Sequence, residues 1–263
     1  VEVAKAITPH KPVVALYVGG SETGRQAGLS HTGSMSGPNE IYDGVFRQCG
    51  IIRATTITEL FDYALALGTL PRPGGNRVII LTHSGGPGAT AADSCGRAGL
   101  ALPQLSPETL DKLKPMIPRT ASTANPVDLT YNRDFAESFF DIPDVLLSEK
   151  DADMLLAYIL SPGSFADRIL KEMGVPEESI PLEREKLLKE HSRAFVSLTK
   201  RHPGKPIVGF TYRSLQETMV RYLIDRGVPV YQDPERAARS MAAVLQYYHK
   251  RDRMVREDKT GGV

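Results

Sequence analysis

The segment with the clearest chemical potential is Gly28–Gly37, where small and hydroxyl-bearing residues surround a histidine. Ser30 and Thr32 stand on either side of His31, and Gly33 follows. A neutral imidazole nitrogen can attack a phosphoryl group and later release it, which divides one difficult transfer into two easier steps. The flanking hydroxyls can bind phosphate oxygens, and glycine lets a ligand approach closely. We therefore predict a reactive His31; the alternative is a loop histidine that hydrogen-bonds only to backbone.

A second candidate is the glycine-rich turn Ser84–Gly88, between a predicted strand and a predicted helix. Ser84, Gly85, Gly86 and Gly88 would present unpaired amides at the positive end of the helix dipole, which suits an anion. The turn matches neither the P-loop pattern nor Gly-x-Gly-x-x-Gly. The alternative is a tight turn that needs glycine only for packing. For His83, just before the turn, a structural role is expected; the alternative is a second participant in the chemistry.

A third candidate is the segment Asn125–Asp128. Pro126 disfavours helical geometry at Asn125, so this segment is expected to be extended or turned. In an open parallel sheet, ligands bind in a crevice at the carboxyl ends of the strands. Asn125 and Asp128 could line that crevice, and Asn125 is a candidate phosphate ligand, although Asn-Pro is also common in turns.

These segments need a scaffold, and the sequence predicts alternating strands and helices. Apolar runs predict strands at 13–17, 51–54, 78–81, 154–160, 206–210 and 228–231, and the stretch 19–38 is expected to be a polar loop. Helices are expected at 39–48, 56–65, 86–97, from 106, at 134–148, at 181–201 and from 234, with capping boxes at Thr56/Glu59 and Ser214/Glu217. Such alternation predicts an α/β fold, with flavodoxin-like parallel sheets and helices on both faces.

The domain organisation is expected to change at the linker Pro71–Gly75. Residues 1–72 supply only about two strands and are interpreted as the C-terminal part of one α/β domain. Residues 73–263 hold about five strand–helix units, the size of a second, flavodoxin-like domain. Because the chain starts without methionine, we expect it to begin partway through a longer protein.

The composition is that of a globular enzyme, with 41% hydrophobic and 24% charged residues. A net charge of +1 argues against a strong, non-specific nucleic-acid binder. No apolar run reaches the roughly 18 residues of a membrane span, and no signal peptide is recognised. The two cysteines, Cys49 and Cys95, give neither a disulfide framework nor a metal-ligand pair, so we expect a cytoplasmic protein without a metal site.

Seven segments in order carry a family resemblance: Ser30-His31-Thr32-Gly33-Ser34, Asp43 to Arg53, Glu59-Leu60-Phe61-Asp62, Gly75-Asn76-Arg77-Val78, Ser84-Gly85-Gly86-Pro87-Gly88, Asn125-Pro126-Val127-Asp128, and Gly227 to Tyr231 with Pro234-Glu235. Their order and spacing resemble the NDP-forming acyl-CoA synthetases, the ADP-forming acetate–CoA ligases related to succinyl-CoA synthetase. One position departs from the pattern, because the family's usual asparagine before the glycine turn is replaced within Thr82-His83-Ser84.

The resemblance implies a ligase that interconverts an acid, CoA and a nucleoside triphosphate with acyl-CoA, nucleoside diphosphate and phosphate. In that family an acyl phosphate forms, a histidine takes its phosphoryl group, and a mobile segment delivers the group to ADP. The resemblance implies that His31 is this histidine. It also implies that Gly85, Gly86 and Gly88 belong to a helix N-terminus that faces the phosphate. The residues themselves add the candidate phosphate ligands Ser30, Thr32, Gly33, Ser84 and Asn125.

The resemblance further implies partners. CoA and ATP or ADP with magnesium would be substrates bound mainly by a CoA-binding domain and an ATP-grasp domain outside this chain, and no cofactor would be tightly bound here. A small organic acid and an oligomeric enzyme are expected, with no nucleic acid and no membrane.

Two other functions remain open. One is a regulatory module that keeps the ligase fold without catalysis; the intact Ser-His-Thr-Gly-Ser favours the enzyme over it. The other is a flavodoxin-like electron carrier, which fits the topology alone and would need bound flavin.

Overall fold

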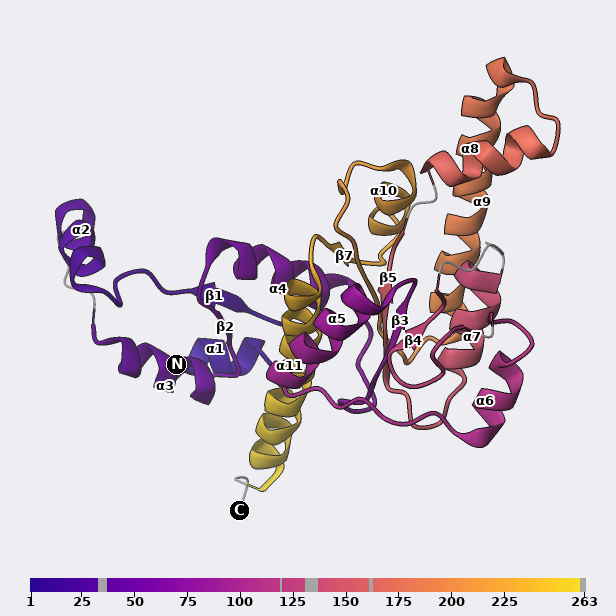
Figure 1. Cartoon of the computed structure of the whole chain (residues 1–263). Helices are drawn as coiled ribbons and strands as arrows, with labels where there is room; N and C mark the ends of the chain where they lie inside the picture. Colours follow the sequence, from indigo (N-terminus) through magenta and orange to yellow (C-terminus); the bar gives the residue numbers. More distant parts are fainter. Residues whose placement is uncertain (33–36, 119, 131–136, 161–162, 261–263) are drawn as a thin grey trace. The chain divides into compact units, whose positions relative to one another are not determined.

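The structure, a computed structural model, describes residues 1–32, 37–118, 120–130, 137–160 and 163–260. The chain forms two compact units, one made of residues 1–68 together with the chain from Ala243 onward, and the other of Thr69–Ala242. Each unit holds one sheet, and every strand pair within the two sheets is parallel (Figure 1). The predicted α/β fold is therefore confirmed.

The first unit is built around a two-stranded sheet. Its elements are α1 (Glu2–Ile7), β1 (Val14–Leu16), α2 (Glu22–Thr32), α3 (Asn39–Gln48), β2 (Ile52–Ala54) and α4 (Ile57–Thr69). β1 and β2 lie in register from Val14 opposite Ile52 to Leu16 opposite Ala54. The predicted cap of α4 is present, since the Glu59 amide donates to Thr56 Oγ1 at 3.1 Å, although the Glu59 carboxylate accepts from Thr55.

Helix α2 corrects the sequence prediction, which placed residues 19–38 in a loop. The Ser21 hydroxyl accepts a hydrogen bond from the Gly24 amide at 3.1 Å, which is the contact of an N-cap residue. Glu22 stands in the first turn, where the helix dipole favours a negative charge, and forms an ion pair with Arg25. The backbone of His31 is therefore helical, and His31 does not lie in a loop.

The second unit contains a five-stranded sheet in the order β4-β3-β5-β6-β7. Its elements are β3 (Val78–Thr82), α5 (Gly85–Arg97), α6 (Pro107–Leu113), β4 (Val127–Asp128), a π-helical turn η1 (Glu137–Asp141), α7 (Ile142–Leu147), β5 (Met154–Tyr158), α8 (Gly163–Glu172), η2 (Glu177–Ser179), α9 (Ile180–Arg201), β6 (Ile207–Phe210), α10 (Thr218–Ile224), β7 (Val230–Tyr231) and the start of α11 (Pro234–Thr260). The chain leaves β3 toward β4 and then returns to the other side of β3 as β5. The boundary between β3 and β5 is thus the topological switch point, where such sheets bind ligands.

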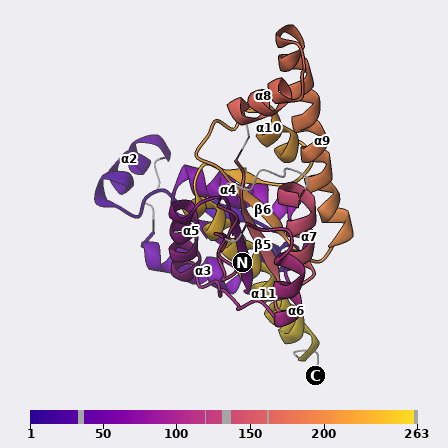
Figure 2. The ribbon, with the colours of Figure 1, turned by 45° about the vertical axis from the view of Figure 1, so that its right-hand side comes forward.

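Helices cover both faces of this sheet, as predicted. Figure 2 shows α5 on one side of β5 and β6, with α7 and α9 on the other. Strands β3 and β6 are buried along their whole length, as expected for parallel strands covered on both faces. One predicted cap is wrong: α10 begins at Thr218, and the Ser214 hydroxyl accepts from the Gln216 amide in the preceding turn.

The end of the chain differs from the predicted division at residue 72, which gave everything up to residue 263 to the second domain. From Ala243 onward, α11 is part of the first unit, where Ala243 and Tyr247 pack with Ile52 and Tyr63. The Tyr247 hydroxyl donates to the Thr8 carbonyl at 3.1 Å. The apolar face of one long helix therefore completes the core of the first unit. The assignment of each unit to a domain of a larger enzyme stays a prediction.

Candidate phosphate-binding site

The glycine turn connects β3 to α5 beside the switch point of the second unit. Ser84 is the N-cap residue of α5, and its hydroxyl makes no capping hydrogen bond. Gly85 and Gly86 are exposed, and helix geometry leaves their N–H groups without intrahelical partners. Pro87 has no N–H, and the Gly88 amide donates to the Ser84 carbonyl at 3.3 Å. Two amides and one hydroxyl are thus available to an anion at the positive end of the helix.

Gly88 has a different role from the two exposed glycines. A Cβ atom at this position would lie 2.9 Å from Thr82 Cγ2 and 3.4 Å from Pro126 Cβ, whereas a Cβ at Gly86 would meet nothing within 4 Å. Gly88 therefore lets α5 pass close to the end of β3. The Thr82 hydroxyl braces the same turn by donating to the Ser84 carbonyl at 2.9 Å.

Asn125 does not behave as the predicted phosphate ligand. Its Nδ2 donates to the carbonyls of Val78 at 2.8 Å and Pro103 at 3.1 Å, and its Oδ1 accepts from the Ile80 amide at 3.0 Å. Backbone groups thus engage both ends of the side-chain amide. Asn125 fastens its own segment to β3 and supplies no free group for a ligand.

Asp128 brings a carboxylate near the turn. Its Oδ1 accepts from the Thr130 amide at 3.0 Å, and its Oδ2 lies 3.7 Å from the point that a Cβ of Gly85 would occupy. A negative charge there is favourable for the helix dipole and unfavourable for a second anion. Asp128 was predicted to line this crevice, and its position agrees with that prediction.

His83 is enclosed at the end of β3. Its side chain is 7% exposed, and its ring lies 6.1 Å from the ring of Phe139 in η1, measured between centroids. Burial lowers the pKa of the imidazole to about 4, so the ring is neutral at pH 7. The structural role expected for His83 agrees with this burial, which no sequence signal indicated.

The His31 segment belongs to the first unit. Ser30 is exposed on α2, the side chains of His31 and Thr32 lie outside the described part of the structure, and Gly33 lies outside the described residues. The hydroxyl of Tyr17, which precedes α2, donates to the carbonyl of Gly37, which follows it, at 2.7 Å, so the chain before α2 and the chain after it lie close together. The Tyr17 ring also stacks on Tyr42 with centroids 3.8 Å apart, a contact that the sequence analysis missed.

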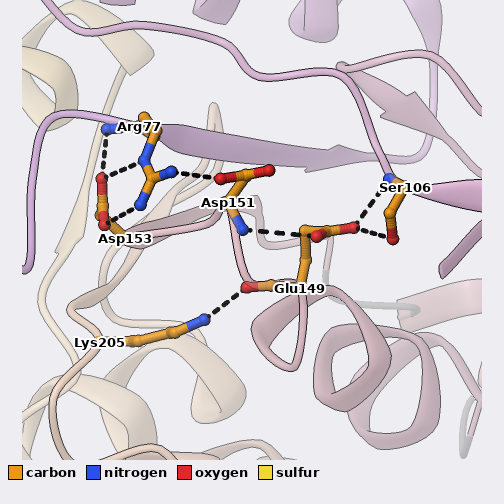
Figure 3. Close-up of polar contacts among 6 residues, drawn as sticks. All are labelled: Arg77, Ser106, Glu149, Asp151, Asp153 and Lys205. Carbon is orange, nitrogen blue, oxygen red and sulfur yellow. Dashed lines mark hydrogen bonds and ion pairs between the residues drawn. The ribbon is translucent and has the colours of Figure 1, made fainter. Parts of the chain in front are cut away.

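The polar cluster in Figure 3 lies at the amino ends of the strands of the second sheet, whereas the glycine turn follows the carboxyl end of β3. Arg77 precedes β3 and is paired with Asp153, from Nε to Oδ2 at 2.9 Å, and with Asp151 (Figure 3). Lys205, before β6, donates to the carbonyls of Leu147 and Glu149 at 2.7 Å. The opposite charges of these groups compensate one another. We therefore interpret the cluster as a structural one that joins the loops before the strands, and not as a ligand-binding site.

Glu149 in this cluster is 3% exposed and accepts hydrogen bonds from the Ser106 amide at 2.9 Å and hydroxyl at 2.7 Å. Burial alone would raise the pKa of Glu149, but these hydrogen bonds outweigh it and lower the pKa to about 2.

Within the described ranges, no group of three or more His, Cys, Asp or Glu side chains is placed to hold a metal ion. No helix in the described part of the chain is long and apolar enough to cross a membrane. Cys49 and Cys95 are both buried free thiols.

Known proteins resemble this chain along most of its length. The succinyl-CoA ligase like flavodoxin domain family matches residues 1–67. The α subunit of the ADP-forming acetate–CoA ligase II of Pyrococcus furiosus is 34% identical over 248 residues, which cover 94% of this chain and 50% of that protein. The ADP-forming 4-hydroxybutyrate–CoA ligase of Nitrosopumilus maritimus is 29% identical, over 94% of this chain and 32% of that protein.

Solved structures give the same relationship. The dinucleotide forming acetyl-coenzyme A synthetase 1 of Ca. Korarchaeum cryptofilum, in complex with phosphate and ADP, matches with a TM-score of 0.75 at 26% identity, over 97% of this chain and 51% of that one. A Pyrococcus horikoshii structure matches with a TM-score of 0.72 at 29% identity, over 95% of this chain and 49% of that one. The chain thus spans about half the length of these two solved proteins and of the P. furiosus subunit. The resemblance to the NDP-forming acyl-CoA synthetase family, predicted from the sequence, is therefore confirmed.

Proposed function

We propose that this chain is the phosphoryl-handling part of an NDP-forming acyl-CoA synthetase. The complete enzyme would interconvert a small organic acid, CoA and a nucleoside triphosphate with acyl-CoA, nucleoside diphosphate and phosphate. The observation that carries the proposal is the glycine turn at the switch point, where two exposed amides and the Ser84 hydroxyl face outward from the start of α5. Its relatives, named as ADP-forming CoA ligases, support the same chemistry.

The proposed transfer proceeds in two steps through His31. A neutral ring nitrogen attacks the phosphorus of an acyl phosphate, the P–O bond to the acyl oxygen breaks, and the carboxylate leaves. In the second step the terminal oxygen of a nucleoside diphosphate attacks the phosphorus, and the P–N bond breaks to restore the neutral ring. The first step follows displacement of CoA from its thioester by phosphate, which produces the acyl phosphate.

The second unit supplies a binding site for phosphate in this scheme. Ser84, Gly85 and Gly86 donate hydrogen bonds, and the dipole of α5 stabilises the negative charge. Gly88 supports the site by allowing the close approach of α5, and Asn125 acts on the fold instead. In the first unit, Ser30, Thr32 and Gly33 would flank the phosphorylated ring.

Binding of the other substrates would require partner domains. CoA and ATP or ADP with magnesium would bind mainly to a CoA-binding domain and an ATP-grasp domain, present on other subunits or elsewhere in a longer chain. We propose an oligomeric enzyme of the cytoplasm that acts on neither nucleic acid nor membrane. The two buried thiols of Cys49 and Cys95 are in keeping with a reducing compartment.

The proposal is tested by phosphorylation of the enzyme reassembled with these partner domains, using γ-labelled ATP. The wild type should acquire an acid-labile label, as expected for phosphohistidine, and His31→Ala should acquire none. Gln26→Ala is a matched control, because it changes an exposed side chain of the same helix and keeps the nucleophile. A label that persists in His31→Ala would move the phosphoryl site elsewhere. A folded wild type without label would favour a non-catalytic module that retains the ligase fold.

A further inference from the structure

Helix α2, whose backbone includes His31, depends for its position on the chain on either side of it. Within the described part of the chain, α2 has no extensive contact with another helix or strand. The residues that enter α2 follow β1, and the residues that leave it precede α3. Contacts between these two stretches therefore determine where the helix that carries His31 lies.

Tyr17, the first residue after β1, joins the two sides of α2. Its hydroxyl donates to the Gly37 carbonyl at 2.7 Å, and its ring stacks on the Tyr42 ring of α3 with centroids 3.8 Å apart and planes 19° from parallel. A Cβ atom at Gly37 would lie 3.3 Å from Tyr42 Cε2, so glycine lets the chain after α2 pass close to the same ring. One tyrosine thus holds the chain before α2 against both the chain after it and α3.

A second contact joins the same two stretches and connects them to the sheet of the first unit. A Cβ atom at Gly20 would lie 3.1 Å from Asn39 Oδ1, so the chain that enters α2 passes close to the first residue of α3. The same Asn39 oxygen accepts a hydrogen bond from Arg53 Nη2 at 2.5 Å. Arg53 belongs to β2 and also pairs with Asp43 of α3. Both stretches that flank α2 are therefore connected to α3 and, through Arg53, to β2.

We propose that Tyr17 is a positioning residue for phosphorylation of His31, because it holds together the two stretches of chain that flank α2. The inference rests on the proposed function, in which His31 takes and releases the phosphoryl group. Fixing the ends of a segment reduces the number of conformations open to it. A histidine on such a segment is found more often in the geometry that the reaction needs. Tyr17 acts through the backbone of the segment, and not on the reacting atoms.

The test measures the single-turnover rate at which the enzyme, reassembled with its partner domains, acquires label from γ-labelled ATP. Tyr17→Phe removes the hydroxyl and keeps the stacked ring, whereas Tyr17→Ala removes both contacts. We expect the rate to fall about threefold to tenfold in Tyr17→Phe, the usual contribution of one hydrogen bond. Loss of the stacked ring in Tyr17→Ala should lower it by about as much again.

Two quantities should not change in these variants. The final amount of label and the KM for ATP should equal those of the wild type, because the nucleophile and the nucleotide-binding domain are intact. Tyr222→Phe is the matched control, since it removes a hydroxyl from α10 in the second unit and keeps the ring on which Arg226 lies. It should acquire label at the wild-type rate.

A distance measurement separates positioning from a general loss of stability. Spin labels at Ala27→Cys on α2 and Glu40→Cys on α3, both exposed positions, report the spread of distances between the two helices by double electron–electron resonance. The native thiols are buried, which directs the labels to the introduced cysteines. The distribution should be broader in Tyr17→Ala than in the otherwise wild-type chain, and Tyr17→Phe should lie between the two.

The outcomes distinguish the two proposals. If the wild type acquires label and both Tyr17 variants acquire it at the same rate, the role of Tyr17 is overturned while the proposed function stands. Slower labelling with an unchanged distance distribution also overturns it, because Tyr17 would then not act by positioning. If the wild type acquires no label, the proposed function fails and the positioning role fails with it. Should Tyr17→Ala not fold, the rate and the distance distribution of Tyr17→Phe decide.

Discussion

The carboxylate of Asp128 controls the charge at the glycine turn. It accepts a hydrogen bond from the Thr130 amide and lies beside Gly85, while Gly85 and Gly86 remain exposed. A phosphate that enters must therefore bind in the presence of an existing negative charge. On the proposed function, Asp128 would limit how tightly phosphate is held, which suits an enzyme that must release phosphate.

We predict that Asp128→Asn strengthens phosphate binding. Asparagine keeps an acceptor for the Thr130 amide and removes the charge, so the dissociation constant should fall about fivefold, the Coulomb contribution of one charge near 4 Å in water. Calorimetry at low salt measures the effect. Asp93→Asn, an exposed change on α5 that removes the same charge farther from the turn, is the control. Weaker binding in Asp128→Asn would show instead that the carboxylate shapes the turn.

Glu149 makes stability depend on pH. Its pKa is about 2 in the folded chain against 4.5 for an ordinary glutamate, so the folded state favours the ionised form. That stabilisation is present above about pH 5 and is lost as the pH falls toward 2, at a cost on the order of 3 kcal/mol. Urea unfolding of Glu149→Gln should show lower stability at pH 7 and a smaller loss between pH 5 and pH 3 than the wild type. Glu178→Gln, at an exposed carboxylate, should retain the wild-type pH dependence.

Helix α5 depends on how closely it approaches β3. Gly88 faces Thr82 and Pro126, whereas Gly86, two residues earlier, faces open space. The helix thus has one glycine required by packing and one that leaves room for a ligand. The two alternatives considered for the glycine turn, close packing and anion binding, apply to different residues of the same turn.

We predict that Gly88→Ala destabilises the second unit by about 1–3 kcal/mol, because the new methyl group would overlap the side chain of Thr82. Gly86→Ala should leave stability unchanged within about 0.5 kcal/mol, since its methyl group meets nothing. Urea unfolding of both variants measures the difference. Equal stabilities would mean that the end of β3 moves to accommodate the methyl group.

The elements most accessible from the sequence were those with a strong apolar pattern or a cap. β3 and β6 are continuous apolar runs, α3 was predicted with its observed bounds, and Ser106 caps α6 through the Thr109 amide at 3.3 Å. β4 was not predicted as a strand, because it is only two residues long and is defined by its pairing with β3. α2 escaped because its glycines and polar residues have low intrinsic helix propensity, while the Ser21 cap acts locally.

The sequence predicted the place of the candidate site better than it predicted which side chains are available to a ligand there. A glycine-rich turn after a strand indicates an anion site from chain order alone. Whether Asn125 is free to bind is a matter of tertiary contact, since its amide is taken up by backbone groups of Val78, Ile80 and Pro103. The burial of His83 likewise depends on η1, which lies more than fifty residues later in the chain.

At the scale of the whole molecule, the first unit is discontinuous in sequence. Its core combines Ile52, Ala54 and Tyr63 with Ala243 and Tyr247 of α11, and Lys250 adds a hydrogen bond to the Ile51 carbonyl at 2.8 Å. The stability of the first unit is therefore expected to depend more strongly on this part of α11 than the stability of the second unit does.

We predict that Tyr247→Ala destabilises the first unit selectively. The side chain is 5% exposed and donates to the Thr8 carbonyl, so its loss should cost about 3 kcal/mol. Hydrogen exchange followed by mass spectrometry should show faster exchange in residues 1–68, with residues 69–242 unchanged. Gln246→Ala, at an exposed position of the same helix, is the control. Faster exchange throughout the chain would indicate that the two units unfold as one.

The discontinuity of the first unit also has a consequence for synthesis on the ribosome. Residues 1–68 emerge first, yet their core is completed only by Ala243 and Tyr247. Translation of the intervening second unit takes on the order of ten to thirty seconds. During that time the second unit can fold, while the core of the first unit is still incomplete. Within this chain, the unit that bears His31 can therefore complete its core only after the second unit has been synthesised.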